Sequence, residues 1–321
     1  QVSLIGEGHE AHLMKRQSKF NLLDLRNTFR RLSKSRARVG TYSKVRFRIK
    51  DVKLAKYRRD PDTNEILKDK KSGEILKDIV IPRLERNEIY LNARTQFAVD
   101  RLRQLVVKLD LDADASLGTD PDTGDPVFDP DATVDVDSVP TDTTAPPQEV
   151  TPVLMNELGD VRNLQTDLFD LCNTGTDGSV ECIQVNVSPD SVVMNSALAQ
   201  VTGIIDLSET FQWQVFGHLD VTTDQISALQ VIEHNASHRS YSGTLSGDYD
   251  AVNDQFNLDV SGTPYPVKDV SLAGVYDSAG NVLDAATDLT NGVNVEVIGN
   301  LIGFMGSGTI TPGVIIISDQ Q

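Results

Sequence analysis

The segment from residue 41 to 50, TYSKVRFRIK, alternates so strictly that it predicts a β-strand with one buried face. Its apolar residues, which alternate along the segment, are Val45, Phe47 and Ile49. Its other parity is entirely basic, and we predict that these side chains form a cationic contact face made of Lys44, Arg46, Arg48 and Lys50. A ladder of positive charge in an acidic chain needs a partner, either within the molecule or outside it.

Charge is divided sharply along the chain, whose formal net charge is −17. Residues 1–108 hold 27 of the 30 Lys and Arg but 13 of the 47 Asp and Glu, which is a balance of +14. The remaining residues carry −31. Such polarity indicates that the two halves face opposite partners, or each other.

The first part of the chain reads as a β-rich domain that ends near residue 155. Residues 78–82 and 104–117 predict strands, and residues 20–32 fit a short helix or the start of a strand. Residues 118–150 hold nine acids, six prolines and no Lys or Arg. Such a composition buries little apolar surface, so we predict a long solvated acidic insertion there.

The second part predicts further short strands and a weak internal repeat. Val215-Phe216-Gly217-His218-Leu219 matches Val297-Ile298-Gly299-Asn300-Leu301, and similar strands flank both copies. Two small β-barrel-like modules in tandem, over residues 156–238 and 239–321, explain the repeat. The predicted fold class is therefore all-β, with an N-terminal β-sandwich before these modules.

Two features bear on the compartment. Cys172 and Cys182 flank a glycine-containing turn, which favours a disulfide-closed hairpin over a pair of buried thiols. Closing that loop would stabilise the fold by roughly 3 kcal/mol and would suit an exported protein. Residues 297–318 lack charge, but their glycines and Pro312 favour a hairpin over a membrane-spanning helix.

Several segments resemble known bacterial domains. FNLLDLRN, VGTYSKVRFRIKDVKL, DIVIP, LVVKLDLDADASL and TPVL resemble a family of domains of unknown function from exported surface proteins and lipoproteins. The resemblance covers residues 1–155 and implies a β-sandwich that lacks its opening strand, with Gln1 inside the fold. The later modules look like a second uncharacterised bacterial family of small β-barrel repeats. Neither resemblance implies a catalytic residue.

Motifs for catalysis or metal binding are weak. No phosphate-binding loop, G-x-S-x-G motif or Cys–His nucleophile pair occurs, so we predict that the protein is not an enzyme. The spacing of His9 and His12 does not suit zinc, and neither does the setting of His234 and His238. The acidic DPDTGD segment could hold Ca²⁺ with carboxylates of Asp120, Asp122 and Asp125, or could be a solvated loop.

These observations favour an exported structural protein of the cell surface or extracellular matrix. Opposite charge at the two ends favours head-to-tail association with copies of itself, and a missing strand beside Gln1 would allow strand addition into a filament. The alternative is a surface module that binds an anionic polymer, such as a polysaccharide or extracellular DNA. An enzyme acting on surface glycans is a third possibility, but no placed pair of carboxylates supports it.

Overall fold

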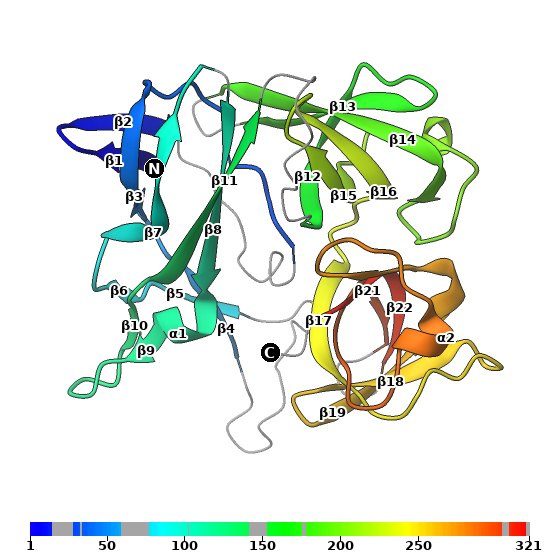
Figure 1. The fold of residues 1–321 in the computed structure, drawn as a ribbon. Helices are drawn as coiled ribbons and strands as arrows, with labels where there is room; N and C mark the ends of the chain where they lie inside the picture. The colour runs from blue at the N-terminus through cyan, green and yellow to red at the C-terminus, as the bar shows by residue number, and fades with distance from the viewer. Residues whose placement is uncertain are drawn as a thin grey trace. The chain divides into compact units, whose positions relative to one another are not determined.

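The computed structural model describes residues 1–14, 28–32, 34–58, 77–101, 103–140, 153–174, 178–303 and 308–318. The chain forms two compact units (Figure 1). Unit 1 contains residues 1–15 and 33–146, and unit 2 contains residues 16–32 and 147–321. The all-β class is confirmed, because helix in the described part is limited to single turns such as α1 (Ala113–Ser116) and α2 (Ala285–Asp288).

The main sheet of unit 1 contains the alternating segment that the sequence marks as a strand. Its antiparallel order is β2-β1-β3-β7, with bounds His9–Met14, Val2–Gly6, Gly40–Arg48 and Glu88–Val99. A register shift in β3 between Tyr42 and Lys44 lets both Tyr42 and Val45 point into the core despite their odd separation. The predicted strand is therefore confirmed, with a bulge that alternation alone does not reveal.

The position of β1 contradicts the expected unfilled seam beside Gln1. β1 is paired on one side with β2 and on the other with β3. The backbone of Gln1 also bonds to Arg48, through Arg48 N–H to Gln1 O at 2.8 Å. β1 therefore has a neighbour on both sides, and among the described strands the outer strands of this sheet are β2 and β7.

The acidic stretch is also more ordered than its composition predicts. β11 (Asp131–Pro140) pairs antiparallel with β8 (Arg103–Asp112) along its whole length. The short strands β9 (Leu117–Thr119) and β10 (Pro126–Phe128) pair with each other, and β10 also pairs with β6 (Arg83–Leu84). The prediction of a solvated loop is wrong for the strands β9, β10 and β11, although residues 121–125 form an exposed turn, and residues 141–150 lie outside the described residues.

The reason for that error lies in the alternation of ATVDVDSV, residues 132–139. Val134 is buried and Val136 is half-buried, whereas Asp135 between them is exposed. The average composition of residues 118–150 does not show this alternation. Alternation with a period of two indicates a strand more strongly than composition indicates a loop.

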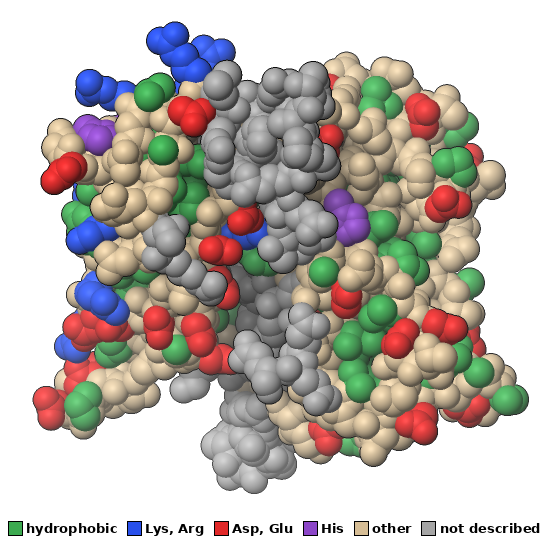
Figure 2. Space-filling model, in the orientation of Figure 1, with side chains coloured by type: hydrophobic (Ala, Val, Ile, Leu, Met, Phe, Trp, Pro, Cys, Tyr) green, Lys and Arg blue, Asp and Glu red, His purple; other side chains and the backbone are tan. Residues whose placement is uncertain are grey.

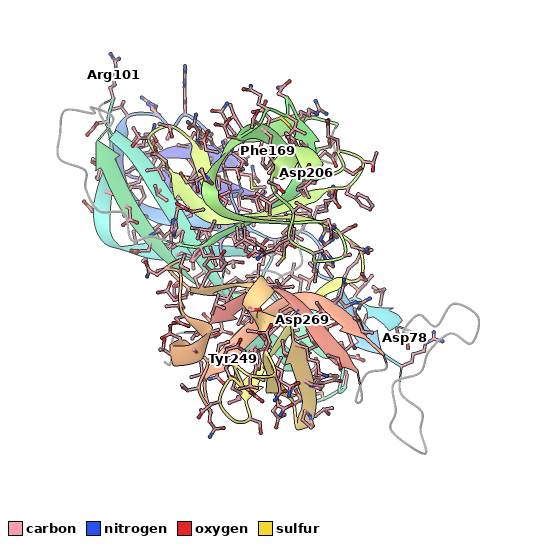
Figure 3. The ribbon with its side chains drawn as sticks, turned by 90° about the vertical axis from the view of Figure 1, so that its right-hand side faces the viewer. Asp78, Arg101, Phe169, Asp206, Tyr249 and Asp269 are labelled. Atoms are coloured by element: carbon pink, nitrogen blue, oxygen red, sulfur yellow. A yellow bond between two sulfur atoms is a disulfide. The ribbon has the colours of Figure 1, made fainter. Side chains whose placement is uncertain are left out.

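A separate two-stranded ribbon completes the sheets of unit 1. β4 (Leu54–Tyr57) pairs antiparallel with β5 (Lys77–Val80), and no other described strand joins either of them. Figure 3 marks this ribbon with Asp78. β5 confirms the strand predicted over residues 78–82.

The strands of the first barrel close in the order β12-β13-β14-β16-β15. Their bounds are Met155–Arg162, Leu168–Thr174, Val180–Met194, Gln225–Glu233 and Trp213–Asp220. Phe169, labelled in Figure 3, packs edge-on against Trp213 with ring centroids 4.9 Å apart. Both rings are fully buried and centre the core of this barrel.

The second barrel follows directly and closes through pairing of β19 with β22. Its strands are β17 (His238–Leu245), β18 (Gln255–Val260), β19 (Thr263–Lys268), β20 (Gly274–Asp277), β21 (Asn294–Ile302) and β22 (Thr309–Ile317). The predicted tandem barrels and the predicted hairpin over residues 297–318 are both confirmed. No helix among the described residues is long and apolar enough to cross a membrane.

The strand registers show that the two barrels are copies of one design. Val215 lies opposite Val231, and at the corresponding positions Val297 lies opposite Ile315. The long strand β14 corresponds to β19 and β20 together, since both run parallel to the last strand of their barrel. The repeat is therefore a repeat of pairing pattern and extends well beyond the five matched residues.

A loop in each barrel repeats the same hydrogen bonds with different side chains. Asn195 N–H donates to Ala199 O, and Asp277 N–H donates to Asn281 O. The positive-φ position of this loop is Leu198 in the first barrel and Gly280 in the second. Comparison of the two sequences does not reveal this shared hydrogen bonding, because Leu198 and Gly280 have the same backbone conformation but different side chains.

Equivalent faces of the barrels meet in one apolar cluster. Phe216 and Ile298 hold corresponding positions, as do Met194 and Tyr276. The fully or nearly buried members are Leu154, Met194, Leu198, Phe216, Ile232, Tyr276, Ile298, Val314 and Ile316. The contact resembles a two-fold dimer interface built within one chain.

Gly217 and Gly299 occupy corresponding positions in the two barrels, and we expect both to be sensitive to substitution. A register shift follows Phe216 and Ile298, and a Cβ on Gly217 or Gly299 would collide with the carbonyl oxygen of Ser227 or Thr311. We expect Gly217→Ala and Gly299→Ala each to destabilise the protein by about 2 kcal/mol or more. Gly203→Ala is the control, because nothing lies within 4 Å of its Cβ position. Urea unfolding checks this, and equal stability of all three variants would contradict it.

Candidate interaction site

The cationic face on β3 is largely satisfied within its own sheet. Arg46 forms ion pairs with Glu10 of β2 and with Glu88 of β7, the latter at 3.7 Å. Arg48 donates to Glu88 through Nε at 2.9 Å. Hydrogen bonds donated by Tyr90 and Arg48 lower the pKa of Glu88. The hydrogen bond between Arg48 and Glu88 also raises the pKa of Arg48.

The other two ladder residues, Lys44 and Lys50, are exposed. Lys44, Arg46 and Arg48 alternate along β3, Lys50 lies beyond its end, and the strands beside β3 supply acids to Arg46 and Arg48. Neither the acidic insertion nor a second copy is needed to neutralise Arg46 and Arg48.

The acids of the insertion pair with other cations of unit 1. Arg83 Nη1 lies 2.9 Å from Asp120, and Lys108 Nζ lies 2.8 Å from Asp137. Arg86 forms an ion pair with Asp129. These contacts neutralise charge across strands that the linear sequence separates by tens of residues.

Counting charge by structural unit changes the electrostatic interpretation. Unit 1 contains 22 Lys and Arg against 23 Asp and Glu, whereas unit 2 contains 8 against 24. On the face drawn in Figure 2, described acids are scattered over the barrels while blue side chains gather over unit 1. The halves of +14 and −31 do not correspond to structural units, because the acidic strands fold with the basic ones.

The proposed calcium ligands do not converge. Asp120 Oδ1 accepts backbone N–H groups of Asp122 at 2.9 Å and Thr123 at 3.2 Å, so this carboxylate caps its own turn. These bonds lower the pKa of Asp120. Among the described residues, no group of three or more His, Cys, Asp or Glu is arranged to hold a metal ion. Calcium binding by Asp120, Asp122 and Asp125 stays a prediction without structural support.

The predicted disulfide is present in the first barrel. Cys172 of β13 lies directly opposite Cys182 of β14, and the two are bonded. Cys172 is buried and Cys182 is exposed. The bond therefore joins neighbouring strands that already pair, and it contributes a covalent tie at the barrel surface.

A different group of residues forms the most elaborate polar site in unit 2. Residues 28–32, which we call the strap, end a segment, residues 16–32, that belongs to unit 2 although the chain before and after that segment belongs to unit 1. Phe29 forms a parallel bridge with Met155 at the start of β12. Phe29 N–H donates to Leu154 O and Asn156 N–H donates to Phe29 O, both at 2.8 Å. The strap thus adds a short strand to the first barrel.

A buried carboxylate lies under the strap. Glu157 shares a face of β12 with Val161 of the barrel core, and only 2% of it is exposed. Its carboxylate accepts the backbone N–H of Arg31 and lies 3.5 Å from Arg30 Nε. Burial raises the pKa of Glu157 to about 7, although both arginines act in the opposite direction.

Two further contacts fix the strap on other elements of the same barrel. Arg31 Nη2 donates to Asp224 in the β15–β16 turn at 3.0 Å. Arg30 Nη2 donates to Asn173 of β13 at 3.3 Å. Basic strap and acidic barrel are therefore complementary in charge as well as in backbone pairing.

This site is absent from the sequence predictions. Residues 20–32 are predicted as a short helix or the start of a strand, and residues 20–27 lie outside the described residues. Two features of the sequence point to the site. Glu157 alternates in step with the buried residues of β12, and Arg30 and Arg31 are adjacent. Which acid these arginines meet depends on residues 126 positions apart, a separation that local patterns do not report.

Comparison with known proteins adds no further constraint, since no family model, curated protein or solved structure matches the chain. The resemblance to exported bacterial domains therefore stays a prediction. Any functional argument has to be carried by the chain's own geometry.

The buried carboxylate predicts an unusual pH dependence. Because its pKa is raised above the ordinary 4.5, Glu157 favours the fold when protonated, and this contribution is lost as pH rises through about 7. Relative to wild type, we expect Glu157→Gln to gain about 3 kcal/mol between pH 4.5 and pH 8. Urea unfolding at both values measures it, with Glu181→Gln as control for removal of one charge. A pH-independent difference would contradict the assignment.

Proposed function

We propose that the protein is a non-enzymatic structural protein of the cell surface or extracellular matrix that associates with copies of itself by strand addition. The β4–β5 ribbon carries this proposal. It exposes 60% of Ile79, and Ile81 just beyond β5 is 74% exposed. A ribbon with exposed isoleucines, whose outer sides no other described strand joins, is a template for a strand from another chain.

The low stability expected of an isolated ribbon also favours strand addition. Two strands alone are marginally stable in water, and further strands or a packed face make them durable. A partner strand beside β4 or β5 would bond backbone groups and cover Ile79 and Ile81. Assembly would therefore stabilise the ribbon as well as join the chains.

Export is supported by the disulfide. A disulfide between Cys172 and Cys182 persists most readily in an oxidising compartment. The strands of the two barrels close into rings, whereas β4 and β5 pair only with each other among the described strands, so the ribbon of unit 1 is the more available strand template.

Head-to-tail growth into a filament is part of the proposal. A ribbon that docks on a different surface of the next copy makes a heterologous contact, which propagates unless the rotation closes it. Charge has a smaller role than the linear sequence suggests, because unit 1 is nearly neutral. Exposed pairs are worth under about 1 kcal/mol each, so association should survive salt.

Binding of an anionic polymer is the second candidate. Arg36, Arg38, Lys44 and Lys50 are exposed cations of unit 1. A titration with labelled DNA or acidic polysaccharide at low and high salt separates this function from self-association. Polymer binding with a steep salt dependence by a chain that stays monomeric would favour the alternative.

Substitutions in the ribbon test the primary proposal. We expect Ile79→Lys with Ile81→Lys to abolish self-association, because buried cations would oppose docking and strand addition. Val252→Lys is a matched control, since Val252 is 93% exposed on a turn of the second barrel. Sedimentation velocity and negative-stain microscopy over a range of protein and salt concentrations give the readout.

A monomeric wild-type chain at every concentration and salt would overturn the proposal. Assemblies that dissolve in salt but persist in the Ile79 and Ile81 variant would also overturn it, and would assign association to charge instead.

A further inference from the structure

The strap has the connectivity of an exchangeable element. Residues 16–32 are assigned to unit 2 between two stretches of unit 1, and the strap is the last part of that segment. The strap meets its acceptor across 126 residues of sequence, through Arg31 and Glu157. No covalent bond holds it to the barrel among the described residues, where the one disulfide lies between β13 and β14.

The acceptor is built in advance by the barrel. Leu154 and Asn156 present a carbonyl and an N–H to the strap, while Glu157 and Asp224 present carboxylates. Without a strap, the carboxylate of Glu157 would lose the Arg31 N–H and the nearby Arg30 guanidinium. A buried acid without these groups is costly, so the acceptor is incomplete when unfilled.

The acceptor is also particular to the first barrel. At the position of Met155 the second barrel has Arg239, and at the position of Glu157 it has Tyr241. The corresponding stretch of β17 therefore lacks the acid and adds a cation. A basic strap would be repelled there rather than held.

We propose that the first barrel also accepts the strap of a second copy of this chain, so that copies associate by exchanging residues 28–32. Every contact that holds the strap is non-covalent and identical whether the strap comes from the same chain or from another. Such exchange is a low-cost route to oligomers. Each copy carries one donor and one acceptor, so exchange yields either a reciprocal dimer or an open chain.

This inference rests on the proposed self-association and names a route that is distinct from the β4–β5 ribbon. Arg30 and Arg31 meet Glu157 and Asp224, so the exchanged contact has a defined direction and register. It also specifies which residues from two different chains come together, and that can be trapped covalently.

The test mixes two full-length variants, Phe29→Cys and Met155→Cys, and adds a short bismaleimide. The native cysteines are already bonded, so the reagent reports only the new thiols. A cross-link from residue 29 to residue 155 within the mixture joins two chains by construction. We expect this linkage by peptide mass spectrometry, increasing with protein concentration and incubation time.

Matched controls make the result specific. Phe29→Cys mixed with Arg239→Cys probes the corresponding position of the second barrel and should give no such linkage. The double variant Phe29→Cys with Met155→Cys should cross-link within one chain, which verifies reach and folding. If Met155→Cys misfolds, Arg31→Cys mixed with Asp224→Cys probes the same docking at a second, half-buried contact.

The outcomes separate the two proposals. If the double variant cross-links while the mixture does not, strap exchange is overturned. If the mixture fails while wild type still forms assemblies that the ribbon substitutions abolish, the proposed function stands and this route is wrong. Equal linkage to residues 155 and 239 would also overturn the inference, since it would show random collision.

Discussion

Pairing of strand edges is the constraint on which this structure depends. Every strand must satisfy its backbone groups while it buries one face, and the chain solves this in two ways. Unit 2 closes two sheets into barrels, and the strap pairs with the start of β12. Unit 1 uses smaller open sheets, including an isolated ribbon in which β4 and β5 pair only with each other among the described strands.

The ion pairs of unit 1 result from the pairing of its strands and do not determine which strands pair. Strands that neighbour each other in space bring Arg46 to Glu10 and Lys108 to Asp137, so most of the formal polarity is cancelled inside unit 1. Only the barrel unit keeps a large excess of acid. Charge then acts locally, as at the strap, where two arginines and two carboxylates select one docking position.

Period-two patterns made much of the fold predictable. The strand over residues 41–50, the tandem barrels and the disulfide could all be inferred, because alternation, short repeats and cysteine spacing are local properties. The acidic insertion was misjudged when its average composition outweighed the alternation around Val134. The expected seam beside Gln1 is wrong, because β1 forms a hairpin with β2 and also pairs with the distant strand β3.

By itself, the sequence determined the all-β class, the two-copy barrel design and the cross-strand disulfide, since each arises from spacing between near neighbours. Only the tertiary structure decided which opposite charges meet, which strand edges are left without a partner, and which acid lies under the strap. Those contacts join residues as far apart as Arg31 and Glu157, and burial then sets their energetics. Register and closure across such separations depend on the whole fold, because a shift of one residue exchanges the two faces of a strand.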